Sequence, residues 1–100
     1  MGILINVALL SDLEIDTRLA SSEWHRHNKA IAREWKLKDF AQAIAFVNSV
    51  ADTAEAANHH PDILIHGWNK VRLTVTNHSA GGLTQADFDL AATLDALPGG

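Results

Sequence analysis

The chain of 100 residues contains no cysteine. Disulfide bonds, thiolate nucleophiles and cysteine-ligated zinc are therefore excluded, and the absence fits a reducing compartment, so we expect a cytoplasmic protein. Proline and glycine are also scarce, with two and six residues, while 47% of the residues are hydrophobic. A chain of this length and composition can bury one modest core, so we interpret residues 1–100 as a single domain.

Blocks of lysine or arginine are missing too, and the formal net charge is −4. Direct binding of nucleic acid is therefore a poor first hypothesis. The apolar start, MGILINVALL, is too short to span a bilayer, has no positive residues before it and is followed by acidic SDLEID. We expect a soluble protein that does not bind membranes, in which residues 1–8 form a leading strand or a disordered or extended leader.

Hydrophobic periodicity predicts an alternation of helices and strands. Helices are expected over 11–20, 38–58 and 84–97, and strands within 21–37 and 62–77, with turns near 27–28 and 66–67. The order is helix-strand-strand-helix-strand-strand-helix. We predict an α+β fold with a four-stranded antiparallel sheet and three helices packed on one face.

The long helix over 38–58 carries the strongest pattern. Its expected buried face is formed by Phe40, Ala43, Ile44, Val47, Val50, Ala51 and Ala54. Asp39 is a suitable N-cap, and Asn58 tolerates the left-handed conformation of a helix C-terminus. The helix should therefore end where His59 and His60 begin. In the first helix, Leu13, Ile15 and Leu19 supply the apolar side, and in the last helix Thr84 and Asp87 resemble a capping box.

Two distant segments should meet at one end of the sheet. The strand after residue 70 alternates cleanly, with Val71, Leu73 and Val75 on one face. If it pairs antiparallel with the strand after Pro61, the start of one strand lies beside the end of the other. This arrangement would bring His78 toward the adjacent pair His59 and His60.

Histidine suits proton transfer near neutral pH, and a group of three can supply both an acid and a base. Glu55 lies four residues before His59, and Asp87 lies in the first turn of the last helix. Either carboxylate could orient an imidazole. A purely structural loop role for the pair is about as probable on local grounds.

Other interpretations of these residue types stay open. With a carboxylate, His59, His60 and His78 have the donors for zinc or iron, although adjacent histidine side chains diverge. We interpret His25, His27 and His66 as surface residues without function. The tryptophans at 24, 35 and 68 are more typical of packing than of ligand contacts.

Three segments in combination resemble a known family, the pterin-4a-carbinolamine dehydratases. They are KLKDFAQAIAFVNSVADTAE, then EAANHHP, then WNKVRLTVTNHSAGGLTQADFDLA. The likeness runs from about Leu9 to Leu97. It implies the α+β fold predicted above and assembly into a homodimer or homotetramer, in which sheets join across a dimer and dimers pair through helices.

The resemblance also implies a function. Family members remove water from 4a-hydroxytetrahydropterin, giving quinonoid dihydropterin in tetrahydrobiopterin recycling, and need neither metal nor organic cofactor. The implied catalytic residues are His59, His60 and His78, with His59 and His78 as the acid/base pair and His60 holding the pterin. Glu55 and Asp87 would support them. The implied substrate-binding residues are His59, His60, Pro61, Asn77, His78, Ser79 and Ala80.

The sequence departs from the family pattern at one point, and the resemblance leaves two alternative functions open. One apparent extra residue between Pro61 and Asn69 predicts a β-bulge near His66 and Gly67. Some members of the family bind a transcription factor as dimerisation coactivators, through the helix face otherwise used for tetramers. This non-catalytic protein-binding role is the main alternative, and a related pterin or molybdopterin role is a third.

Overall fold

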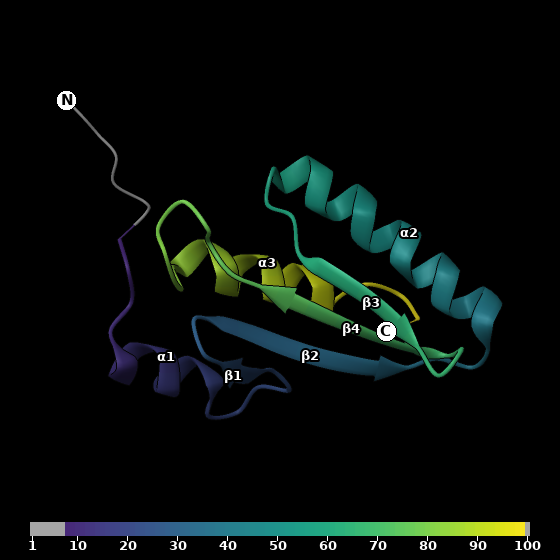
Figure 1. The fold of residues 1–100 in the computed structure, drawn as a ribbon, viewed down its shortest axis with the longest axis horizontal. Coiled ribbons are helices and arrows are strands. Elements are labelled where there is room, and N and C mark those ends of the chain that lie inside the picture. The colour runs from purple at the N-terminus through teal and green to yellow at the C-terminus, as the bar shows by residue number, and fades with distance from the viewer. Residues whose placement is uncertain (1–7, 100) are drawn as a thin grey trace.

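The computed structural model describes residues 8–99, and these form three helices and four strands (Figure 1). In chain order the elements are α1 (Asp12–Leu19), β1 (His25–His27), β2 (Ala30–Lys36), α2 (Phe40–Ala57), β3 (Asp62–His66), β4 (Lys70–Val75) and α3 (Gln85–Asp95). The prediction for residues 1–8 concerns a segment that lies, except for Ala8, outside the described residues. No helix within residues 8–99 is long and apolar enough to cross a membrane.

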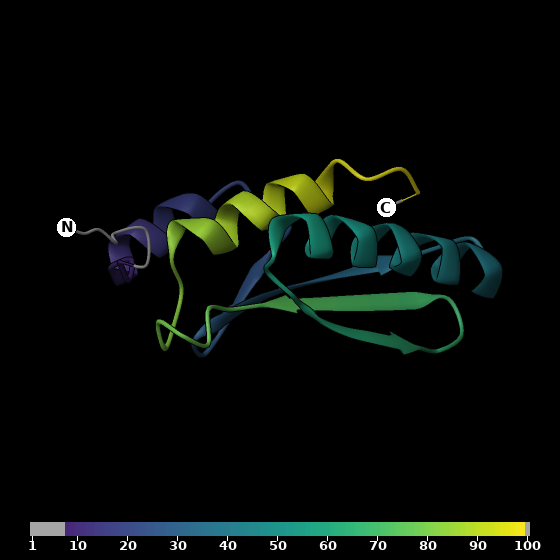
Figure 2. The ribbon, with the colours of Figure 1, turned by 90° about the horizontal axis from the view of Figure 1, so that it is seen from above.

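The four strands form one antiparallel sheet in the order β1-β2-β4-β3. The helices lie on one side of it, as Figure 2 shows, and the other side is uncovered. The predicted α+β class, element order and one-sided packing are confirmed. The alternation in β4 has the expected consequence, because Val71, Leu73 and Val75 are fully buried beneath the helices.

The caps of α2 are those predicted, but its buried face is partly different. Asp39 accepts a hydrogen bond from the backbone N–H of Gln42, and Asn58 ends the helix with φ of 50°. The buried residues are Ala43, Phe46, Val50 and Ala54. The prediction was wrong for Phe40, Ile44 and Ala51, which are exposed. It missed Phe46 because an alanine-rich helix has apolar residues on more than one face, and only packing decides which face is buried.

The shortest helix, α1, begins with a reciprocal cap. In α1, Ser11 Oγ accepts from the Glu14 backbone N–H and Glu14 Oε1 accepts from the Ser11 backbone N–H. Ile15 is buried as predicted, whereas Leu13 is 76% exposed and the prediction for it was wrong. Because α1 has only eight residues and lies at the edge of the sheet, it buries only the side that carries Ile15, and Leu13 lies on a side that faces solvent.

Two tryptophans join β2 to the helices. Trp24 and Trp35 are buried with their rings edge to face at 5.7 Å, and Trp35 also packs on Phe46 at 5.1 Å between ring centroids. Asp95 at the end of α3 accepts from Trp24 Nε1 at 2.8 Å and from the Arg33 guanidinium at 2.6 Å. The packing interpretation is correct for both rings.

The β3–β4 turn accommodates the apparent extra residue. The register runs without interruption from Asp62 opposite Thr74 to His66 opposite Lys70, so the predicted β-bulge is wrong. The chain reverses instead through Gly67 and Trp68, both with positive φ, of 55° and 61°. This left-handed conformation is costly for a bulky residue. Trp68 is 62% exposed, so the packing interpretation was wrong for this third tryptophan.

Candidate active site

Three segments meet at one end of the sheet, as the antiparallel pairing of β3 and β4 requires. They are the C-terminus of α2, the end of β4 with the loop after it, and the first turn of α3. Together they line an open hollow of about 420 Å³, within the size range of small-molecule sites. The residues lining it are Ala57, Asn58, His59, His60, Thr76, Asn77, His78, Ser79 and Ala86.

His59 is held at one ring nitrogen. Its Nε2 lies 2.9 Å from Asp87 Oδ1 and 3.1 Å from the backbone carbonyl oxygen of Thr76. Hydrogen-bond geometry is satisfied toward Thr76, while Asp87 Oδ1 has only the close approach. A carbonyl and a carboxylate both accept, so we assign the proton of neutral His59 to Nε2. The lone pair of Nδ1 is then free.

Asp87 both caps α3 and contacts His59. Its side chain is fully buried. Oδ2 accepts from the Thr84 backbone N–H at 2.7 Å and from Thr84 Oγ1–H at 3.2 Å, which caps α3. Oδ1 remains directed at His59. A buried carboxylate is costly unless it is paired, so the cap and the imidazole together account for its position.

His60 pairs with the other predicted carboxylate. Its Nε2 lies 2.5 Å from Glu55 Oε1, and both side chains are more than half exposed. The sequence predicted that Glu55, four residues before His59, could orient an imidazole, without deciding which one. The left-handed Asn58 turns the chain after α2, and Glu55 meets the second histidine instead. The two adjacent imidazoles therefore have separate carboxylate partners.

His78 lies on the loop that follows β4. Asn77 shapes this loop, because its Oδ1 accepts from the Ala80 backbone N–H at 3.0 Å and its backbone carbonyl accepts from Gly81 at 2.9 Å. His78 and Ser79 are exposed and line the hollow, whereas Pro61 and Ala80 are not among its lining residues. Sequence reasoning missed the Thr76 carbonyl, because a backbone acceptor leaves no signal in side-chain identity.

The remaining histidines, His25, His27 and His66, do not line this hollow. His66 Nε2 is 2.6 Å from Glu34 Oε1 on the uncovered face of the sheet. This hydrogen bond is the main reason that the pKa of Glu34 is lowered; burial opposes it with the second-largest effect, and the charges of His66, Arg72 and Lys70 lower the pKa further. Within residues 8–99, no three His, Asp or Glu side chains are grouped so that they could hold a metal ion.

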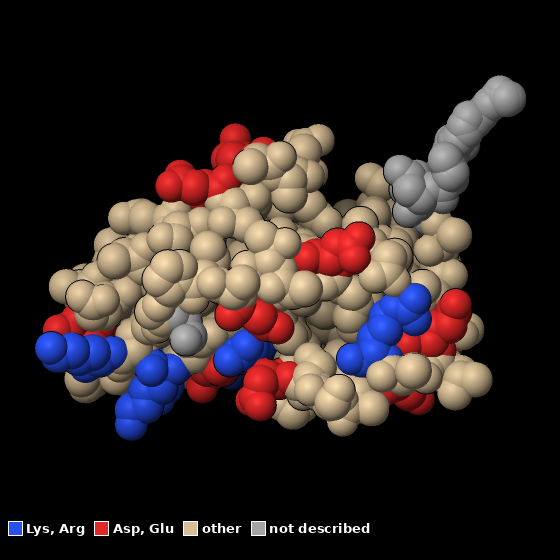
Figure 3. Space-filling view, turned by 180° about the vertical axis from the view of Figure 1, so that it is seen from behind, with Lys and Arg blue, Asp and Glu red and all other residues tan. Residues whose placement is uncertain are grey.

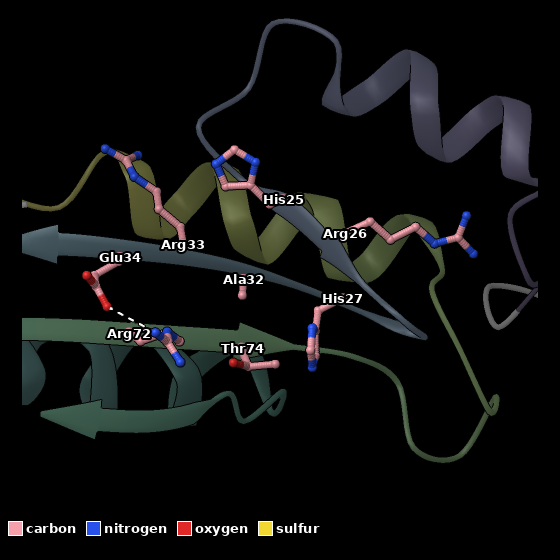
Figure 4. Close-up of a pocket in the computed structure, with 8 residues that line it drawn as sticks. All are labelled: His25, Arg26, His27, Ala32, Arg33, Glu34, Arg72 and Thr74. Atoms are coloured by element: carbon pink, nitrogen blue, oxygen red, sulfur yellow. Dashed lines mark hydrogen bonds and ion pairs between the residues drawn. The ribbon is translucent and has the colours of Figure 1, made fainter. Parts of the chain in front are cut away.

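A larger hollow, of about 520 Å³, lies over the uncovered face near β1. His25 and His27 approach it from one strand and Glu34 and Arg72 from the two central strands, with Ala32 between them (Figure 4). Arg72 is 3.4 Å from Glu34. The larger hollow lacks the three histidines that line the smaller one, and no buried carboxylate contacts its histidines as Asp87 contacts His59, so we place the candidate site in the smaller.

Comparison with known proteins identifies the family of the chain. The family model described as pterin 4 alpha carbinolamine dehydratase matches residues 8–97. A protein of Picosynechococcus sp. provisionally named pterin-4-alpha-carbinolamine dehydratase is 52% identical over 89 residues, which cover 88% of this chain and 96% of that protein. A protein of the same provisional name from Roseiflexus sp. is 53% identical over 89 residues, covering 88% and 95% of the two chains.

Solved structures share the fold. A transcriptional coactivator/pterin dehydratase from Brucella melitensis superposes with a TM-score of 0.80 at 32% identity, covering 87% of this chain and 95% of that one. A pterin dehydratase-like protein identified as a RuBisCO assembly factor in the alpha-carboxysome gives a TM-score of 0.65 at 27% identity, covering 79% and 93%. From its sequence and its fold, the chain belongs to the pterin-4-alpha-carbinolamine dehydratase family.

Proposed function

We propose that this protein is a hydro-lyase that removes water from 4a-hydroxytetrahydropterin and gives quinonoid dihydropterin, as part of tetrahydrobiopterin recycling. The observation that carries the proposal is the environment of His59. One of its nitrogens is held by Asp87 and Thr76, and the ring lies in a hollow that His60 and His78 also line. Family membership supplies the reaction class.

The base in this proposal is Nδ1 of His59. With the proton on Nε2, Nδ1 keeps a lone pair that can accept the proton from N5 of the pterin. The electrons of the N–H bond then form the double bond between N5 and C4a. Protonation of His59 gives an imidazolium beside a buried carboxylate, and Asp87 stabilises this charge without taking the proton.

The acid is His78. As the double bond forms, the bond between C4a and the hydroxyl oxygen breaks, and a proton from His78 makes the leaving group water. One proton is taken and one is given, so the two histidines exchange their protonation states and are reset through solvent. His78 is exposed, which suits this exchange. In this proposal both proton transfers are made by side chains of the protein, those of His59 and His78.

The remaining residues position the substrate. His60, paired with Glu55 at the mouth of the hollow, would donate or accept hydrogen bonds at the edge of the pterin ring. Asn77 and Ser79 line the same space. In this proposal Pro61 and Ala80 act on the substrate through the backbone conformation that they give to the neighbouring segments.

The test is the rate of loss of 4a-hydroxytetrahydropterin that is generated in situ by a hydroxylase. Wild type should accelerate the loss, and His59→Ala and His78→Ala should each lower kcat by about 10²- to 10⁴-fold. His25→Ala, on the uncovered face, is the matched control and should keep wild-type activity. Thermal unfolding shows whether each variant is folded. If wild type gives no acceleration, the dehydratase proposal is wrong.

A second candidate function is protein binding, because α2 exposes apolar side chains. Phe40 and Ile44 are 54% and 37% exposed, and the surface over α2 carries no lysine or arginine (Figure 3). The same surface could join copies of this chain into the homodimer or homotetramer that the family resemblance implies. Sedimentation equilibrium of wild type and Ile44→Glu tests self-association, which the charge should weaken while activity stays.

A further inference from the structure

Thr76 lies between the end of β4 and the loop that carries His78. Strand pairing with β2 stops just before it, since the register ends at Val75 opposite Ile31. The sheet ladder alone therefore does not fix the backbone of Thr76. The position of this backbone is important because the carbonyl oxygen of Thr76 accepts from His59 Nε2 at 3.1 Å.

The side chain of Thr76 is bonded toward a different segment. Its hydroxyl donates to the backbone carbonyl of Lys29 at 2.5 Å, in the turn between β1 and β2. In the sheet, β2 and β3 flank β4 on opposite sides. Lys29 lies just before β2, and His59 lies shortly before β3. Thr76 therefore joins a turn on one side of β4 to the candidate base on the other.

The turn that offers this carbonyl is itself held in place. It consists of Asn28 and Lys29, between two paired strands. Asn28 takes the left-handed conformation, with φ of 57°, which asparagine tolerates better than most residues. Its carbonyl oxygen accepts from Arg26 Nε at 3.1 Å. Because threonine is β-branched and has few χ1 rotamers, a fixed acceptor at Lys29 also limits where the Thr76 backbone can lie.

Of the two acceptors beside His59 Nε2, the Thr76 carbonyl is the one with satisfied hydrogen-bond geometry. Asp87 Oδ1 approaches to 2.9 Å but makes no hydrogen bond. The hydrogen bond at one ring nitrogen determines which nitrogen of a neutral imidazole carries the proton. Displacement of the Thr76 carbonyl would therefore loosen the ring and let the proton occupy either nitrogen.

We propose that Thr76 is a positioning residue for the dehydratase reaction. Its hydroxyl, anchored on the β1–β2 turn, fixes the carbonyl that keeps the proton of His59 on Nε2. The residue acts through His59, whose Nδ1 then stays free as the base. The effect on the rate rests on the proposed function, whereas the effect on the His59 proton can be measured without catalysis. A small misplacement of a catalytic group can lower the rate steeply.

The experiment compares wild type with Thr76→Val, Thr76→Ser and Thr74→Val. Valine has the shape of threonine without the hydroxyl, and Thr74, earlier in β4 and outside the candidate site, is the matched control. We expect Thr76→Val to lower kcat about tenfold with KM unchanged, because the base is displaced while the hollow keeps its shape. Thr76→Ser keeps the hydroxyl, so it and Thr74→Val should keep the wild-type kcat.

The nitrogen NMR signals of the His59 ring supply a readout that a loss of stability alone would not move. They are recorded at a pH where the ring is neutral, and they distinguish a protonated nitrogen from one with a free lone pair. Wild type should show the proton on Nε2. In Thr76→Val the two signals should move toward each other as the tautomers mix, and Thr76→Ser should restore the wild-type spectrum. Thermal unfolding shows whether each variant is folded.

An unchanged His59 spectrum in Thr76→Val would overturn the proposal, whatever the activity. A changed spectrum with unchanged kcat would overturn the role of Thr76 in the reaction. Equal losses in Thr74→Val would mean that valine acts through the sheet and would also overturn it. If wild type has no dehydratase activity, the proposed function is wrong, and the spectrum still decides whether the Thr76 hydroxyl holds the His59 proton.

Discussion

At the scale of single residues, the proton on His59 Nε2 decides what the site can do. Both neighbours of this nitrogen, Asp87 Oδ1 and the Thr76 carbonyl, are acceptors. They keep the proton there and leave Nδ1 as the basic atom. A side chain that changed one acceptor into a donor would reverse this arrangement, although the site would keep its shape.

Asp87→Asn makes that change. The two oxygens of Asp87 face two N–H donors, those of Thr84 and His59, and an amide can satisfy only one of them. We expect kcat to fall by about 10²- to 10⁴-fold, because the proton of His59 moves to Nδ1. Thermal unfolding should shift by only a few degrees. Asp89→Asn, an exposed neighbour on α3, is the control, and an unchanged kcat in Asp87→Asn would contradict the tautomer assignment.

Glu34 makes stability depend on pH in acid. Its pKa lies below the ordinary value of 4.5, mainly because His66 hydrogen-bonds to it. A carboxyl whose pKa is lowered by folding stabilises the folded state above its unfolded pKa, and this contribution is lost as the pH falls through the folded pKa. Because the side chain is 40% exposed, solvent screening limits the contribution to less than about 1 kcal/mol.

The measurement is the free energy of unfolding in urea of wild type and Glu34→Gln. Wild type should be slightly more stable at neutral pH, and the difference should disappear at a pH well below 4.5. His66→Ala removes the donor and should reproduce the loss at neutral pH. A difference that grew as the pH fell would show that the carboxyl acts through some other contact.

At the scale of elements, the C-terminus of α2 places the two histidines. Asn58 has φ of 50°, and its N–H donates to the carbonyl of Glu55, while the His59 N–H donates to that of Ala54. The reversal that follows sends His59 toward α3 and His60 back toward Glu55. The different partners of two adjacent residues therefore depend on one left-handed residue.

Asn58→Ala should damage both stability and activity, since an alanine costs about 1 kcal/mol or more in the left-handed region. We expect the midpoint of thermal unfolding to fall by roughly 4–8 °C and kcat to fall with it, as His59 loses its alignment. Asn58→Gly adopts the same backbone without strain and should keep both properties. Equal losses in the glycine variant would mean that the asparagine side chain itself is needed.

At the scale of the whole molecule, stability comes from a single core between the sheet and the helices. Phe46 lies at its centre, 2% exposed and in contact with Trp35, which in turn packs on Trp24. Phe40 belongs to the same helix and is 54% exposed. Phe46 and Phe40 are therefore two phenylalanines of one helix, six positions apart, of which the first is buried and the second is exposed.

Phe46→Ala should reduce the free energy of unfolding by about 3–5 kcal/mol, a large part of the total for a domain of this size. Phe40→Ala should change it by less than about 1 kcal/mol. Chemical denaturation of both variants tests the difference. Similar losses in the two would mean that the Phe40 side chain is buried in solution, as it would be if α2 joined copies of the chain.

The sequence alone was sufficient for what depends on local periodicity and backbone preference. The alternation of Val71, Leu73 and Val75, the caps at Asp39 and Thr84 and the left-handed Asn58 are local properties, and each was predicted correctly. Antiparallel pairing then brought His78 to the same hollow as His59 and His60, because the ends of paired strands must meet.

Only the tertiary structure decided what depends on packing between distant segments. It selected Phe46 over Phe40, since an alanine-rich helix offers several apolar faces and the sheet covers one. It also kept the pairing of β3 with β4 uninterrupted up to His66, where a bulge was expected near His66 and Gly67. The extra residue is accommodated in the exposed turn that contains Trp68. It also assigned Asp87 to His59 and brought the Thr76 carbonyl to the same nitrogen, a contact between three segments that no local pattern records.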